Sequence, residues 1–124
     1  MVNDPLEIAG FIANVMNDKK AEDIEILGIK DLTVIADYFV ICTGRNSNQI
    51  SSICDEIEEK LKDQGIKAGH IEGLRSNNWI LMDYGSVIVH IFSPTDRDFY
   101  QLDKIWADAK KLSYTSVSYT HLRA

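Results

Sequence analysis

The stretch that decides the fold is WILMDYGSVIVHIF, residues 79–92. Its apolar runs at 79–82 and 87–92 predict two strands, joined by a short turn at 83–86. The second run, VIVHIF, does not alternate between apolar and polar residues, which is typical of a strand covered on both faces. We therefore expect this hairpin to lie in a sheet that packs between helices.

Length, charge and cysteine content limit the class of protein. A chain of 124 residues predicts one domain that can bury a core without disulfides, and Cys42 and Cys54 are expected to be small core residues. The net charge of −6 argues against a main role in gripping phosphate backbones and favours a basic partner. The apolar runs are far shorter than a membrane span and no secretory start is present, so we expect a cytoplasmic protein without membrane contact.

Helix signals surround the hairpin. Asp4 and Pro5 begin a helix that should run to about Lys19, and Ser47 can cap a second helix that closes at Gly65. A last helix is expected to begin at residues 93–94 and to continue to about residue 109. Residues 113–124, SYTSVSYTHLRA, follow no period of either kind. We take residues 1–112 as the domain and 113–124 as a tail that is disordered or left over from cloning.

Strands are expected at 24–28, 38–43 and 67–71 in addition to the hairpin. The strand at 38–43, the helix after it and the strand near 67–71 form a β-α-β unit, whose crossover should be right-handed and whose strands should be parallel. The strands that follow should be antiparallel. The expected fold class is α/β: a mixed five-stranded sheet flanked by helices, an α/β sandwich.

Two polar residues, Asp83 and His90, stand in apolar strands, where a polar group costs free energy unless it has a partner. If the turn centres on residues 84–85, then Asp83 pairs with Ser86, Leu81 with Ile88, and Trp79 with His90. Alternation then places five side chains on one face: Trp79, Leu81, Asp83, Ile88 and His90.

This face has two interpretations. It can be a recognition patch, with an aromatic anchor, an apolar floor and a carboxylate for an incoming Lys or Arg. It can equally be a structural hairpin under a helix, in which Asp83 closes the turn and His90 is hydrogen-bonded internally. The pattern alone leaves both open.

Catalytic and metal-binding motifs are absent from the sequence. The histidines have no partner at metal-ligand spacing, the cysteines form no C-x-x-C, and no G-x-G-x-x-G or P-loop is present. Ser47 before a helix resembles the start of a nucleotidyltransferase site, but that chemistry needs two Mg²⁺-binding carboxylates about one strand position apart. No Asp-x-Asp or Asp-x-Glu stands on an expected strand. We therefore expect no catalytic residue, no metal, no cofactor and no enzyme activity.

Several segments in unbroken order resemble the Iojap family, the ribosomal silencing factors called RsfS. They are ADYFVICTG at 36–44, Gln49-Ile50, EGL at 72–74, the hairpin at 79–92 and RDFYQLDKIW at 97–106. The resemblance implies a non-enzymatic repressor of translation that binds the large ribosomal subunit through ribosomal protein L14 and sterically blocks joining of the small subunit. It also implies a nucleotidyltransferase-like fold that lacks the catalytic carboxylates.

The resemblance further implies a partner-facing surface at the hairpin, with no direct nucleic-acid specificity. Carried over residue by residue, the surface comprises Trp79, Leu81, Met82, Asp83 and Tyr84, with His90 as a supporting neighbour. Three alternatives stay open: a nucleotidyltransferase-like enzyme, a large-subunit assembly factor like the mitochondrial and plastid relatives, and a homodimer formed through sheet edges or the apolar hairpin face.

Overall fold

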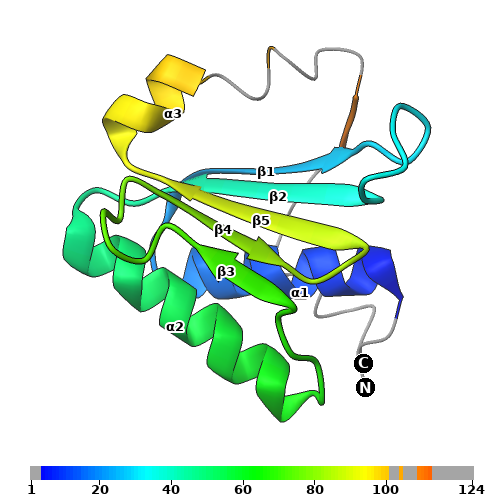
Figure 1. The fold of residues 1–124 in the computed structure, drawn as a ribbon, viewed down its shortest axis with the longest axis horizontal. Helices are drawn as coiled ribbons and strands as arrows, with labels where there is room; N and C mark the ends of the chain where they lie inside the picture. The colour runs from blue at the N-terminus through cyan, green and yellow to red at the C-terminus, as the bar shows by residue number, and fades with distance from the viewer. Residues whose placement is uncertain (1–3, 101–103, 105–108, 113–124) are drawn as a thin grey trace.

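The computed structural model describes residues 4–100, 104 and 109–112 (Figure 1). The elements in chain order are α1 (Pro5–Asp18), β1 (Glu22–Gly28), β2 (Tyr38–Thr43), α2 (Ser47–Asp63), β3 (His70–Glu72), β4 (Trp79–Asp83), β5 (Val87–Phe92), α3 (Pro94–Tyr100) and β6 (Lys110–Leu112). None of the described helices combines the length and the apolar character that a bilayer crossing requires.

The strands form one mixed sheet in the order β3-β4-β5-β2-β1-β6. β2 and β5 are parallel, whereas every other neighbouring pair is antiparallel. The expected α/β class is confirmed, but the described sheet has six strands where the sequence predicted five. The additional strand, β6, is a three-residue segment that pairs with β1 and is too short to show a period.

The β-α-β prediction needs one refinement. β3 runs in the same direction as β2, as expected, but β4 and β5 lie between them in the sheet. The place beside β2 is taken by β5, because the hairpin inserts its second strand into the centre of the sheet. All six residues of β5 are buried, which confirms a strand covered on both faces.

Two apolar clusters sandwich the sheet. α1 and α2 cover one face, and α3 lies on the other, at the end where β5 finishes (Figure 1). The cluster on the α1–α2 side takes Val87, Val89 and Ile91 from β5, and the opposite cluster takes Ile88 and Phe92. Cys42 and Cys54 are buried, free thiols whose pKa burial raises to about 12, so both serve as core residues.

The helix ends follow ordinary capping chemistry. Asp4 caps α1, as expected, by accepting a hydrogen bond of 3.1 Å from the Leu6 N–H. The cap of α2 is Asn46 and not Ser47, because Asn46 is the extended residue whose side chain accepts from the Gln49 N–H at 2.9 Å. Gly65 follows α2 with φ of +80°, as its role at the end of the helix requires.

The hairpin register differs from the predicted one by two residues. Trp79 pairs with Phe92, Leu81 with His90 and Asp83 with Ile88. The turn centres on Gly85 and Ser86, and only Gly85 has positive φ, at +83°, which matches a two-residue type II′ turn. Since side chains alternate with a period of two, this slip keeps the predicted grouping of side chains on one face.

The last predicted helix is described only in part. α3 covers Pro94–Tyr100, and Lys104 is also helical. Residues 101–103 and 105–108 lie outside the described residues, as does the predicted tail at 113–124.

Candidate partner-binding face

The face of the sheet opposite α1 and α2 carries the predicted hairpin residues Trp79, Leu81 and Asp83. All three are partly exposed, whereas the intervening Ile80 and Met82 are fully buried on the other side. Their alternation follows from the pleat of β4, which sends successive side chains to opposite faces. We call this surface the β3–β4 face; it comprises Trp79, Leu81 and Asp83 of β4 and His70 and Glu72 of β3.

Trp79 is held in one orientation by its neighbours. Its indole Nε1 donates a hydrogen bond of 3.0 Å to Nδ1 of His90, and its ring stacks on Phe92 at 5.0 Å between centroids. Indole nitrogen can only donate, so His90 must accept through an unprotonated Nδ1. The anchor of the candidate face is therefore positioned before any partner arrives.

His90 is a buried supporting residue. It is 4% exposed, and burial lowers the pKa of its imidazole to about 4, so the ring is neutral near pH 7. The ring of Phe39 also packs against the imidazole in a T-shaped arrangement, with the two centroids 4.7 Å apart. With Nδ1 accepting, the proton of the neutral ring sits on Nε2, which has no hydrogen-bond partner among the described residues.

Asp83 closes the hairpin turn with its side chain. Its Oδ1 accepts a hydrogen bond of 2.8 Å from the Gly85 N–H, while the Tyr84 N–H donates to the Val87 carbonyl at 2.9 Å. Two contacts expected under the structural interpretation are therefore present: Asp83 closes the turn, and His90 is hydrogen-bonded internally. The same contacts leave Asp83 partly exposed at the end of the face.

The edge strand β3 adds residues that the sequence analysis did not place in the site. His70 pairs with Asp83 and Glu72 pairs with Leu81, so both side chains stand on the same face. His70 Nε2 lies 2.6 Å from Glu72 Oε2, and both side chains are more than half exposed. Leu81 therefore has two carboxylates beside it, Glu72 across the strand pair and Asp83 two residues along β4. The sequence did predict a strand near residues 67–71. It could not show which residues of that strand stand beside Leu81 and Asp83, because the register against β4 depends on the tertiary structure.

Two of the six predicted residues lie on the opposite side of the sheet. Met82 is fully buried in the core cluster under α1 and α2. Tyr84 packs against the same cluster, and burial raises the pKa of its phenol above the ordinary value. Both follow from the alternation of β4, so neither can belong to the β3–β4 face while the sheet is intact.

Away from the β3–β4 face, a polar cavity of about 530 Å³ opens where the parallel strands β2 and β5 finish. Arg97 lies in its wall, donating to Thr43 Oγ1 at 3.1 Å and pairing with Glu25 Oε2 at 3.8 Å. β1 begins at Glu22, two residues earlier than predicted. As a result, Asp23-Ile24-Glu25 is an Asp-x-Glu on a strand, and the expectation that no such pair exists was wrong.

Asp23 and Glu25 do not have the regular strand geometry that would align their two carboxylates on one face of β1. Asp23 has φ of +52°, and the register of β1 shifts between Glu22 and Glu25, which breaks the alternation that would align the two side chains. Within the described part of the chain, no group of three or more His, Cys, Asp or Glu residues could hold a metal ion.

The fold and the face define a class: a small mixed α/β sandwich with an aromatic and acidic sheet face. A solved structure from Chromobacterium violaceum shares the fold with a TM-score of 0.82 at 29% identity, over 91% of this chain and 93% of that chain. The family model described as "Ribosomal silencing factor during starvation" (RsfS) matches residues 2–123. The chain belongs to this family of ribosomal silencing factors.

Curated relatives agree with this assignment. The ribosomal silencing factor RsfS of Halalkalibacterium halodurans is 36% identical over 111 residues, which cover 90% of this chain and 95% of the relative. That of Bacillus subtilis is 39% identical over 102 residues, covering 82% and 86%. A more distant mouse relative, 24% identical over 77% of this chain and 43% of its own length, is named for mitochondrial assembly of the ribosomal large subunit.

Proposed function

We propose that this chain is a non-enzymatic, cytoplasmic silencing factor that binds the large ribosomal subunit through ribosomal protein L14. Bound there, it sterically blocks joining of the small subunit and so represses translation. The family assignment supports a role at the ribosome. The observation that carries the proposed contact is the β3–β4 face, where a pre-oriented Trp79 lies next to Leu81 and Leu81 has Glu72 and Asp83 beside it.

The chemistry of this face suits a basic protein surface. An oriented aromatic ring beside an aliphatic side chain is the usual centre of a protein–protein hot spot. Carboxylates at the rim favour an approaching Lys or Arg and speed association through charge. The net charge of −6 acts in the same direction, since ribosomal proteins are generally basic.

Truncation of the face tests the proposed contact. Trp79→Ala and Leu81→Ala should each weaken binding to purified L14, and Trp79→Ala by about 2 kcal/mol, or about 30-fold in Kd. Leu6→Ala is the matched control, because Leu6 is 45% exposed on α1, on the other side of the sheet. Circular dichroism must show that each variant is folded. Folded Trp79 and Leu81 variants that bind L14 as tightly as the Leu6 variant would place the contact elsewhere.

The nucleotidyltransferase-like alternative now has a specific observation in its favour. Asp23 and Glu25 line the cavity of about 530 Å³ at the ends of β2 and β5. Against it, Arg97 already pairs with Glu25 and the bulge in β1 disturbs the pair. Calorimetric titration with Mg²⁺ and a nucleoside triphosphate separates the two: the silencing proposal expects no binding, and saturable binding abolished by Glu25→Gln would favour the enzyme.

An assembly role is the other candidate, suggested by the name of the mouse relative. It requires the same contact with the large subunit but at an earlier stage. Sedimentation of lysates from cells that lack the protein distinguishes the two. Accumulated large-subunit precursors would favour assembly, whereas normal subunits with excess joined ribosomes during starvation would favour silencing.

A further inference from the structure

Three cations gather around one groove of this acidic molecule. Lys19, Lys20 and Arg45 line a groove of about 330 Å³, together with Asp18, Gln49 and Ser52. The first two follow α1, and Arg45 lies in the loop between β2 and α2. The groove thus carries three cationic side chains and one carboxylate on a chain whose net charge is −6.

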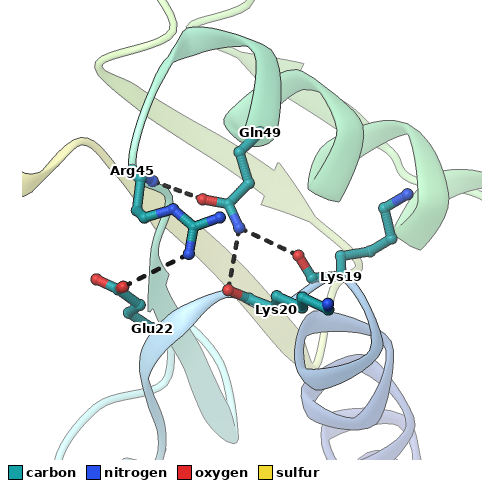
Figure 2. Close-up of polar contacts among 5 residues, drawn as sticks. All are labelled: Lys19, Lys20, Glu22, Arg45 and Gln49. Atoms are coloured by element: carbon teal, nitrogen blue, oxygen red, sulfur yellow. Dashed lines mark hydrogen bonds and ion pairs between the residues drawn. The ribbon is translucent and has the colours of Figure 1, made fainter.

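A single amide side chain fixes the backbone of all three cations (Figure 2). Gln49 Nε2 donates to the carbonyl oxygens of Lys19 and Lys20 at 3.1 and 3.0 Å. Gln49 Oε1 accepts from the Arg45 N–H at 2.6 Å. The first turn of α2 therefore holds the end of α1 and the Arg45 loop together, so the three cations start from a fixed frame.

The backbone of Lys20 is unusual for a lysine. Its φ is +62°, and the bonds from Lys20 N to Asn17 O and from Ala21 N to Met16 O, both 2.9 Å, form a Schellman motif. Glycine is the usual residue at this left-handed position, because it adopts positive φ without steric cost. Here the position carries a positive charge instead.

The three cations are available for a new partner. Arg45 pairs with Glu22 at 3.9 Å, but the two side chains are 57% and 52% exposed, so the pair is weak and easily exchanged. No ion pair of Lys19 or Lys20 occurs in the described part of the chain. Arginine can readily exchange a carboxylate partner for a phosphate, whose oxygens accept two parallel hydrogen bonds from the guanidinium N–H groups.

The groove is also tied to the β3–β4 face. Asn77, two residues before β4, donates from Nδ2 to Ser51 Oγ at 2.5 Å and to the Ser47 carbonyl at 3.2 Å. The first turn of α2 therefore connects Gln49 on one side with the start of β4 on the other. The groove itself lies where α1 ends and α2 begins, and these helices cover the side of the sheet opposite the β3–β4 face, so the two surfaces would make separate contacts with one large particle.

We propose that Lys19, Lys20 and Arg45 form a phosphate-binding groove that contacts the RNA backbone of the large ribosomal subunit. The contact is electrostatic, reads no sequence, and supplements the protein contact of the β3–β4 face. It rests on the proposed function for the identity of the particle. It adds an RNA contact to a chain whose overall charge argues against phosphate binding as its main role.

Removal of the three charges tests this contact. The variant K19Q/K20Q/R45Q is compared with K60Q/K62Q/K67Q, which loses the same charge at the far end of α2 and beyond, where all three lysines are exposed. Binding to 50S subunits and to isolated L14 is measured at several salt concentrations. Lys20→Gly is a second variant, since it removes one charge while placing glycine where the backbone favours it.

The groove variant should bind isolated L14 as the parent does but bind 50S subunits at least about tenfold more weakly at low salt. Its slope of log Kd against log salt should be smaller by about 2, which corresponds to three lost phosphate contacts. Lys20→Gly should show about a third of that change, and the control variant none. Equal behaviour of groove and control variants, or an equal loss on isolated L14, would overturn the RNA contact. A parent protein that binds neither 50S nor L14 would instead overturn the proposed function itself.

Discussion

At the scale of the residue, one indole–imidazole hydrogen bond organises the candidate face. Trp79 can donate to His90 only while Nδ1 of the imidazole is unprotonated. Burial favours that neutral state and holds the pKa of His90 at about 4, far below the ordinary value of 6.5. The orientation of the aromatic anchor is therefore linked to a proton.

This linkage predicts the pH dependence of stability. Between pH 6.5 and pH 4 the unfolded chain binds a proton at His90 that the folded chain does not, so stability falls as pH falls through this window. His90 should contribute its full stability above pH 6.5 and lose about 2 kcal/mol between pH 7 and pH 5. Urea unfolding of the parent and of His90→Leu at both pH values isolates the effect. The same loss in both proteins would assign it to other groups.

Asp83 combines a turn bond with an exposed charge, and two substitutions separate these roles. Asp83→Asn keeps an oxygen for the Gly85 N–H, whereas Asp83→Lys removes it and reverses the charge. Asp83→Lys should weaken binding to L14 more than Asp83→Asn, with Asp83→Ala as the control for the lost turn bond. If Ala and Lys variants bind equally well, charge at this position has no part in recognition.

At the scale of the element, the sequence predicted the strands better than their partners. Residues 38–43 and 87–92 were placed correctly because β-branched and aromatic runs specify strands locally. The predicted hairpin register differs from the observed one by two residues, since Tyr84-Gly85 and Gly85-Ser86 are both acceptable turns. The predicted grouping of side chains on one face is still correct, because side chains alternate with a period of two residues. β6 and the early start of β1 depend on pairing with other strands, which no local pattern records.

The loop that leads into β4 depends on a glycine, which gives a prediction with an internal control. Gly73 and Gly65 both have positive φ, at +91° and +80°. A Cβ at Gly73 would meet the Trp79 carbonyl oxygen, whereas at Gly65 it would meet nothing within 4 Å. Gly65→Ala should cost about 1 kcal/mol of unfolding free energy and Gly73→Ala clearly more, above about 3 kcal/mol. Chemical denaturation of both variants measures this, and equal costs would contradict the close approach.

At the scale of the whole molecule, α1 and α2 cover one side of the sheet, and the β3–β4 face lies on the other side, where Trp79, Leu81 and Asp83 are partly exposed among the described residues. Alternation along β4 was enough to predict Trp79, Leu81 and Asp83 as one group. It also explains why Met82 and Tyr84 lie on the other side of the sheet, since a resemblance carried along consecutive positions ignores the two faces of a strand. Glu72 could not be found this way, because it reaches the face only through the pairing of β3 with β4.

The central claim is that the bound protein blocks subunit joining, and a sucrose-gradient assay with purified 30S and 50S subunits tests it most directly. At a hundredfold excess over Kd, binding should stabilise free 50S by about 2.7 kcal/mol and lower the yield of 70S particles. This effect should not require hydrolysis of a nucleotide by this chain. Preformed, translating 70S ribosomes should stay intact, because the joining surface is already covered. An unchanged 70S yield at saturating protein, or a block that requires nucleotide hydrolysis by this chain, would contradict the account.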